Sequence, residues 1–210
     1  MSHVDDRLVE LALGALAPTE RVELELHLAA CGECRATLED LRASFTGLAI
    51  GLDPRRPAPE VGELLARRVR GDARFLPFVD RLGALFDLPS EEAEGVLHRI
   101  DDPSAWGADG IVPGGEVMLV APGPAFEGAI ASLLRLPPEA RYPRHRHLGT
   151  ERILFLAGGV EHDDGSTADA GTLVASATGS AHGFRVLPGQ PCIAAVLLQG
   201  GVELDPDERV

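Results

Sequence analysis

Three potential metal ligands lie close together near the start of the chain: His27, Cys31 and Cys34. Their spacings of four and three residues return to the same face of a helix, so one imidazole and two thiolates can converge on one ion. Tetrahedral zinc takes nitrogen and sulfur ligands of this kind, and His3 is the candidate for the fourth position. We predict a structural zinc site formed by His3, His27, Cys31 and Cys34.

Other interpretations of the two cysteines remain open. Cys31 and Cys34 could be small core residues, a redox-active dithiol, or a thiol switch that loses zinc on oxidation. A thioredoxin-like dithiol should follow a strand in a βαβ unit, and the residues around this pair have a helical pattern. The histidine four residues before Cys31 favours zinc, whereas His3 taken alone is typical of an exposed, inert histidine.

A second group of metal-binding side chains lies in the second half of the chain. Residues two apart on a strand face the same side, so His145 and His147 can both point into a barrel while Arg146 points out. Glu151 follows after a short turn, and His182 on a later strand can complete the group. Three imidazoles and a carboxylate suit zinc, iron, manganese, nickel or copper, so these residues do not select the metal. The alternative is an exposed polar strand face.

The elements that would position the first group are helical. Leu8, Val9 and Leu11 give residues 5–16 a helical period, and Pro18 suits the first position of a second helix. We expect Gly32 to end this second helix and Cys34 to begin a third. The third helix is expected to bury four residues, namely Leu38, Leu41, Phe45 and Leu48. A core this small commonly needs a metal, which makes the zinc structural.

Residues 51–59 contain three prolines and predict a linker, after which Val61, Leu64, Leu65 and Val69 form an apolar stripe on a short helix. Residues 75–100 predict two more helices, the second capped by Ser90. From Gly110 onwards, short β-type runs alternate with glycine and proline turns, which is typical of a β-sandwich or barrel. These runs are 116–120, 129–136, 152–156, 172–175, 184–187 and 193–198.

Composition limits the possible partners. The chain of 210 residues is 45% hydrophobic, carries a formal charge of −14 and contains no lysine. Such a surface repels nucleic acid, so direct DNA binding is disfavoured and a basic protein partner is favoured. No apolar run reaches the roughly 20 residues of a membrane span, and no signal peptide is recognisable, so we expect a cytoplasmic protein without membrane contact. Cys192 remains outside both sites and is interpreted as a core residue.

Both groups resemble known motifs. An early histidine followed by HxxxCxxC, here His3, His27, Cys31 and Cys34, resembles the zinc-binding anti-sigma family. The run from His145 to Glu151 resembles the first cupin motif, and His182 matches the histidine of the second, although Ala177–Ser180 replaces the Pro-x-Gly expected there. Together they resemble the ChrR type of anti-sigma factor. The resemblance implies a helical bundle that holds a sigma factor of the extracytoplasmic-function (ECF) class and a cupin needed for the response to stress such as singlet oxygen.

We therefore predict a two-domain α plus β protein. A zinc-stabilised helical domain spans 1–71, a helical connector 72–108 and a cupin β-barrel 109–205. The predicted cofactors are zinc in the first domain and a second divalent metal in the cupin, with zinc as the first candidate. The predicted function is sequestration of an ECF sigma factor until a stress signal releases it, without enzymatic activity. The alternative is a metal-dependent cupin dioxygenase or isomerase with a helical accessory domain.

Overall fold

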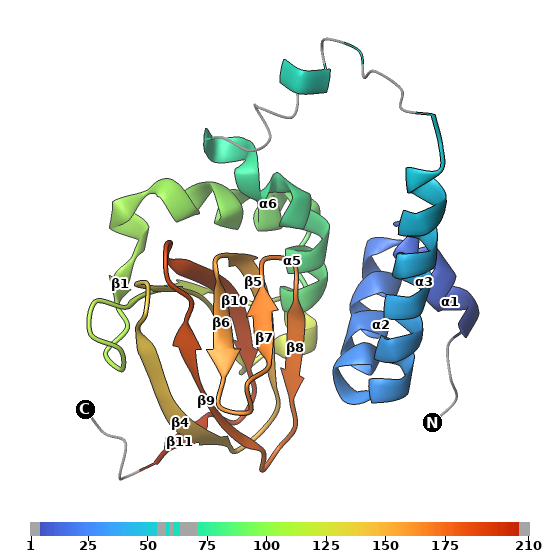
Figure 1. The fold of residues 1–210 in the computed structure, drawn as a ribbon. Helices are drawn as coiled ribbons and strands as arrows, with labels where there is room; N and C mark the ends of the chain where they lie inside the picture. Colours follow the sequence, from blue (N-terminus) through green and yellow to red (C-terminus); the bar gives the residue numbers. More distant parts are fainter. Residues whose placement is uncertain (1–4, 54–57, 59–60, 64–70, 206–210) are drawn as a thin grey trace. The chain divides into compact units, whose positions relative to one another are not determined.

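The computed structural model describes residues 5–53, 58, 61–63 and 71–205 (Figure 1). The chain forms two compact units, Met1–Arg74 and Phe75–Val210. Within the described residues, every helix is too short or too polar to cross a membrane. The predicted fold class is confirmed: a small helical unit precedes a cupin sandwich of two antiparallel sheets.

The first unit consists of three helices. These are α1 (Asp5–Ala12), α2 (Pro18–Ala30) and α3 (Gly32–Ile50). Pro18 occupies the first turn of α2, where its missing N–H costs nothing because the first amides of a helix have no partner inside it. Both α1 and α2 pack against α3. Their buried side chains form one small core of Leu8, Leu11, Leu24, Leu28, Cys34 and Leu38.

The break between α2 and α3 differs from the prediction. Cys31 has an extended backbone (φ −118°, ψ 102°) and separates the two helices by itself. Gly32 therefore begins α3 instead of ending α2, and Cys34 lies in the first turn of α3. The Cys31 amide still donates to the carbonyl of His27 at 2.9 Å, so the chain bends sharply without losing this bond.

The predicted buried face of α3 is correct only near its start. Leu38 is buried and Leu41 packs at the edge of the core, but Leu48 is 69% exposed. The reason is length, because α3 has 19 residues whereas α2 has 13 and α1 has 8. Its last turns extend beyond the helices that cover its first turns (Figure 1).

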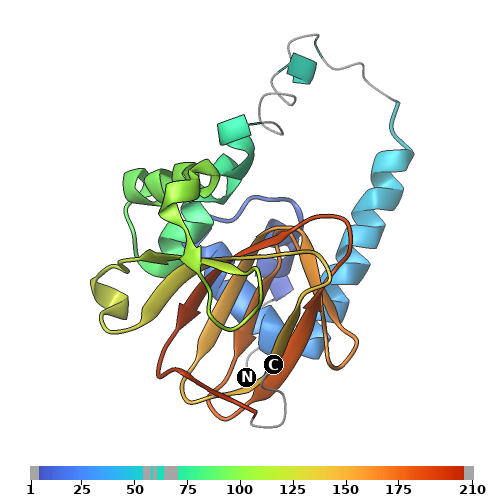
Figure 2. The ribbon, with the colours of Figure 1, turned by 90° about the vertical axis from the view of Figure 1, so that its left-hand side faces the viewer.

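The residues that we interpreted as a connector pack on the sandwich from Phe75 onwards. They form η1 (Gly71–Phe78), α5 (Val79–Phe86), α6 (Ser90–His98), η2 (Arg99–Asp101) and η3 (Pro103–Ala105). The helix α5 buries Leu82, Leu85 and Phe86 and contacts two strands of the sandwich. Arg81 donates to the Gly171 carbonyl at 2.8 Å. These helices lie over one end of the sandwich (Figures 1 and 2).

The sandwich has two antiparallel sheets. The first has the strand order β1-β2-β3-β10-β5-β8 and the second β11-β4-β9-β6-β7. The first sheet contains β1 (Gly107–Ala108), β2 (Glu116–Val120), β3 (Ile130–Leu136), β5 (Glu151–Ala157), β8 (Leu173–Ser176) and β10 (Cys192–Leu198). The second contains β4 (Arg141–His147), β6 (Gly159–His162), β7 (Thr167–Asp169), β9 (Ala181–Val186) and β11 (Val202–Leu204).

Apolar side chains from both sheets form the core between them. The first sheet contributes Ile153, Phe155 and Val196, and the second contributes Val160 and Val186. Cys192 is buried in the same cluster, as predicted. Gly158 turns the chain from β5 to β6 with φ +66°, and a Cβ there would lie 2.6 Å from the Pro191 carbonyl oxygen. This crossing from one sheet to the other therefore requires glycine.

Candidate metal sites

The structure brings together three of the four predicted ligands in the first unit. His27 lies in the last turn of α2, Cys31 at the break and Cys34 in the first turn of α3. Their ligand atoms lie within 4.8 Å of one another, and His27 Nε2 is 3.3 Å from Cys34 Sγ. The fourth predicted ligand, His3, lies outside the described residues.

The chemistry of this group fits zinc. Two thiols and an imidazole converge, and tetrahedral zinc with bonds of about 2.0–2.3 Å places its ligands at comparable mutual distances. Hydrogen bonding from the Cys34 backbone N–H is the main cause that lowers the pKa of the Cys31 thiol. Because the thiolate is the metal-binding form, this shift favours coordination. The three residues could therefore hold a zinc ion.

The second group is assembled from three strands of the cupin. In β4, Arg144 and Arg146 are exposed while His145 and His147 are buried, which confirms the predicted alternation. Glu151 begins β5 and is also buried. His182 lies on β9, directly opposite His145 in the β4–β9 pair. The ligand atoms of all four residues lie within 4.8 Å of one another.

Distances and unpaired atoms show that this group suits a cation. Glu151 Oε2 lies 3.8 Å from His147 Nε2 and 3.5 Å from His182 Nε2. These three atoms are buried, and none of them has a hydrogen-bond partner among the described residues. Such atoms are costly unless something else binds them, and a divalent metal would bind all three. His145 Nδ1 lies 3.0 Å from the Pro143 carbonyl oxygen, and donation there leaves Nε2 free to act as a ligand.

Burial also keeps two of these histidines in the metal-binding form. Desolvation is the main cause that lowers the pKa of both His145 and His147. The Glu151 carboxylate acts in the opposite direction and is the smaller effect at each. Neutral imidazoles are the form that binds metals, so the group is prepared for a cation near neutral pH.

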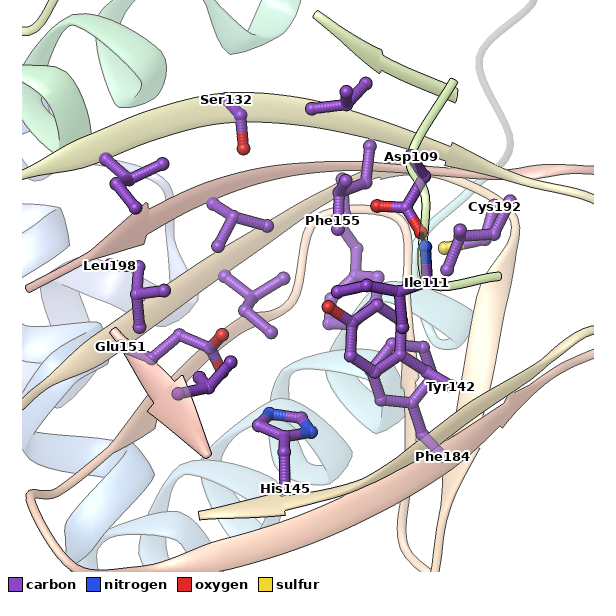
Figure 3. Close-up of a pocket in the computed structure, with 18 of the residues that line it drawn as sticks. Asp109, Ile111, Ser132, Tyr142, His145, Glu151, Phe155, Phe184, Cys192 and Leu198 are labelled. Atoms are coloured by element: carbon purple, nitrogen blue, oxygen red, sulfur yellow. Dashed lines mark hydrogen bonds between the residues drawn. The ribbon is translucent and has the colours of Figure 1, made fainter. Parts of the chain in front are cut away.

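A cavity of about 360 Å³ lies beside the second group and inside the sandwich. His145 and Glu151 form part of its wall, and most of the remaining wall is apolar (Figure 3). Tyr142 also lines the cavity, and sequence reasoning did not identify this residue as part of a site. The signal was available, because Tyr142 and His145 lie on the same strand. The bulge between them in the β4–β9 register was not predictable.

His162 lies next to the second group. It ends β6 half-buried, with its ring stacked on that of His182 at 5.5 Å and an interplanar angle of 20°. Burial is the main cause that lowers its pKa. Asp163, the next residue, accepts from the Gly183 amide at 2.7 Å and thereby fixes this turn against β9. His162 is therefore a neighbour of the ligand group and not one of its four members.

Comparisons with known proteins support this description. Residues 105–200 match the model of the ChrR cupin-like domain, and residues 2–35 match the model described as "Putative zinc-finger". No curated protein matches the chain. The anti-sigma ChrR of Rhodobacter sphaeroides, solved in complex with SigE, shares 25% identity over 95% of this chain and 99% of its own, with a TM-score of 0.47. An acetylacetone dioxygenase from Acinetobacter johnsonii shares 18% identity over 52% of this chain and 78% of its own (TM-score 0.44).

The fold and the two groups of ligands define a protein in which a zinc-finger helical unit precedes a cupin that could bind a metal. In this combination and order of domains, the chain is similar to the ChrR type of anti-sigma factor.

Proposed function

We propose that this protein is a cytoplasmic anti-sigma factor that sequesters an ECF sigma factor and releases it when the cupin senses a stress signal. One observation carries the proposal: a zinc-finger helical unit and a ChrR cupin-like domain occur in the same chain. The helical unit binds the sigma factor, and the cupin changes the affinity of the helical unit for it. An oxidative signal such as singlet oxygen is the first candidate.

The surface of the helical unit supports a protein partner. Leu48 is 69% exposed and Ile50 80%, and Leu52, just after α3, is 71% exposed. Three large exposed apolar side chains within five residues are uncommon on a surface that meets only water, and such groups typically mark protein contacts. They lie where α3 extends beyond α1 and α2, so a partner helix can pack there without disturbing the small core.

Charge selects the kind of partner. The formal charge of −14 opposes contact with DNA and favours a protein with a basic surface. A sigma factor binds DNA and therefore presents such a surface. The proposed mechanism is occlusion, in which the helical unit covers the surfaces by which the sigma factor engages RNA polymerase.

We assign different roles to the two metals. In the first unit, His3, His27, Cys31 and Cys34 would hold zinc, whose binding energy is also folding energy for a core of few residues. In the cupin, His145, His147, Glu151 and His182 would hold a second divalent ion, with zinc as the first candidate. This ion would supply a Lewis-acidic position next to the cavity.

The cupin fold is shared with enzymes, and the contact between the ligand group and a cavity favours a second candidate function. In this alternative, the protein is a metal-dependent dioxygenase or isomerase. We prefer sensing because the wall of the cavity offers Glu151 as its best-placed base, and coordination of the metal would occupy that carboxylate.

The test is complex formation between the purified full-length protein and candidate ECF sigma factors, followed by transcription in vitro. We expect a stable complex and inhibition. Leu48→Glu should weaken the complex at least tenfold, because it places a charge in the apolar contact. Leu119→Glu is the matched control, since Leu119 is also 69% exposed but lies in the second unit. No complex with any candidate, or equal loss for both variants, would contradict the proposal.

A further inference from the structure

The cavity inside the cupin has the properties of a binding site for a small molecule. Its volume of about 360 Å³ falls within the range of ligand pockets. An apolar cavity of about 150 Å³ can hold a benzene molecule, so this one has room for roughly ten to fifteen non-hydrogen atoms. Leu134, Ile153, Phe155 and Val196 are among the apolar side chains that form its wall. The body of a fitting ligand must therefore be apolar.

The charged groups of the wall exclude many ligands. Asp109 and Glu151 line the cavity, and no arginine or lysine does so among the described residues. Asp109 accepts hydrogen bonds from the amides of Ile111 and Val112 and is thereby committed to its own loop. A divalent ion held beside Glu151 would be balanced by the Glu151 and Asp109 carboxylates, and no cationic side chain among the described lining residues is left to attract an anionic ligand. The wall therefore favours a neutral molecule.

One hydroxyl group in the cavity is free to bind such a molecule. The Tyr142 ring stacks on Phe184 at 5.1 Å and meets the edge of His145 at 5.3 Å, which fixes its position. Its hydroxyl points into the space enclosed by Ile111 and Glu151 (Figure 3) and makes no hydrogen bond within the described part of the chain. A tyrosine hydroxyl carries its proton at neutral pH and can therefore donate a hydrogen bond.

The route into the cavity is also apolar. Leu119 on β2 and Ile130 on β3 line the cavity, yet they are 69% and 51% exposed. These two residues therefore lie where the cavity meets solvent. A molecule that enters here passes exposed apolar side chains of β2 and β3.

From these features we propose that the cupin cavity binds a small neutral molecule with an apolar body and one carbonyl-type oxygen, and that the Tyr142 hydroxyl donates a hydrogen bond to this oxygen beside His145 and Glu151. A small molecule in this position can directly alter the arrangement of the side chains that would hold the metal. The inference deepens the proposed function by naming what the cupin senses. Only the regulatory role of the small molecule rests on the proposed function, because binding of the molecule to the cavity is measured without a sigma factor.

The test compares three probes of nearly equal size on the full-length protein by calorimetry. Butyrophenone has a carbonyl oxygen, butylbenzene has none and 4-phenylbutanoate has a carboxylate. We expect butyrophenone to bind best. Tyr142→Phe keeps the ring and removes only the hydroxyl, so it should weaken butyrophenone roughly three- to tenfold, the effect of one hydrogen bond, and leave butylbenzene unchanged.

Two variants test whether the small molecule enters the cavity past Leu119. Leu119→Glu should weaken both butyrophenone and butylbenzene, whereas the equally exposed Leu48→Glu in the first unit should weaken neither. Failure of both neutral probes to bind at millimolar concentration would overturn the ligand class. Equal loss of butyrophenone and butylbenzene in Tyr142→Phe would overturn the role of the hydroxyl. Failure to bind any sigma factor would overturn the proposed function and leave these binding results unaffected.

Discussion

His145 and His182 lie directly opposite each other in the β4–β9 pair, and their ring centroids are 4.7 Å apart. This register brings together residues 37 positions apart in the sequence. It depends on a bulge between Tyr142 and His145, which shifts the second half of β4 relative to β9. The bulge leaves both His145 and His147 facing inward, where Glu151 completes the group. The ligand group is therefore a product of strand pairing as much as of the HxH spacing.

The buried histidines predict that the metal-free cupin loses stability on acidification. The pKa values of His145 and His147 are lowered by burial, so below about pH 6.5 the unfolded chain binds protons that the folded chain does not. Unfolding then becomes easier as the pH falls, by at most about 1.4 kcal/mol per pH unit for each histidine. Above pH 6.5 this effect is absent.

The measurement is urea unfolding of chelator-treated protein between pH 7.5 and 5.5. Unfolding is monitored by the fluorescence of Trp106, the chain's single tryptophan. Because Trp106 lies in the second unit, it reports the cupin and not the zinc unit. The His147→Gln variant should make the free energy of unfolding depend less on pH. The control His98→Gln, at an exposed position on α6, should leave this pH dependence unchanged. A flat profile for the unaltered protein would contradict the prediction.

Zinc in the first unit should depend on Cys34. The Cys34→Ser variant loses a thiolate that is buried next to His27, so zinc should dissociate and the three helices should loosen. Elemental analysis should find about one zinc fewer per chain, and circular dichroism should show lower helicity at 37 °C. Cys192→Ala, at a buried cysteine of the cupin core, should keep this zinc. If the zinc content of the Cys34→Ser variant is unchanged, Cys34 is a core residue and not a zinc ligand.

Arg135 should be important for attaching the short helices before β1 to the sandwich. Its guanidinium lies 4.0 Å from the centre of the Trp106 ring, pairs with Glu116 at 3.0 Å and donates to the Ile100 carbonyl. Arg135→Met keeps the aliphatic stem and loses these interactions, so we expect a loss of about 1–3 kcal/mol in the free energy of unfolding. Arg185→Met, at an exposed position on β9, should cost less than about 0.5 kcal/mol. Equal costs would show that Arg135 has no special role.

Sequence patterns predicted those features that depend on local spacing. The HxxxCxxC spacing identified His27, Cys31 and Cys34, and the two-residue period of a strand placed His145 and His147 on one inner face. The strand pattern works because a strand has a fixed two-residue period, whereas His27 meets the two cysteines because all three flank the break between α2 and α3.

Features set by distant packing were not predictable. Leu48 continues the apolar period of α3, and only the shorter lengths of α1 and α2 leave it exposed. His162 is followed by a polar turn in the sequence, and its stacking on His182 follows from the β6–β9 pairing. Tyr142 could have been read as an ordinary core residue, because its role depends on a cavity that several strands enclose.

The last prediction separates holding the partner from sensing the signal. Glu151 is buried, begins β5 and lies inside the second unit. Glu151→Ala removes one of the four candidate metal ligands, and we expect it to leave the strands and the outer surface of the cupin in place. We therefore expect this variant to bind its sigma factor with unchanged affinity and to lose release under the inducing stress. The measurement is sigma-dependent transcription with and without stress, with His98→Ala as the control at an exposed histidine of the same unit. Weak binding in the absence of stress would show that the cupin helps to hold the partner, and full inducibility would make the His145–Glu151–His182 group structural.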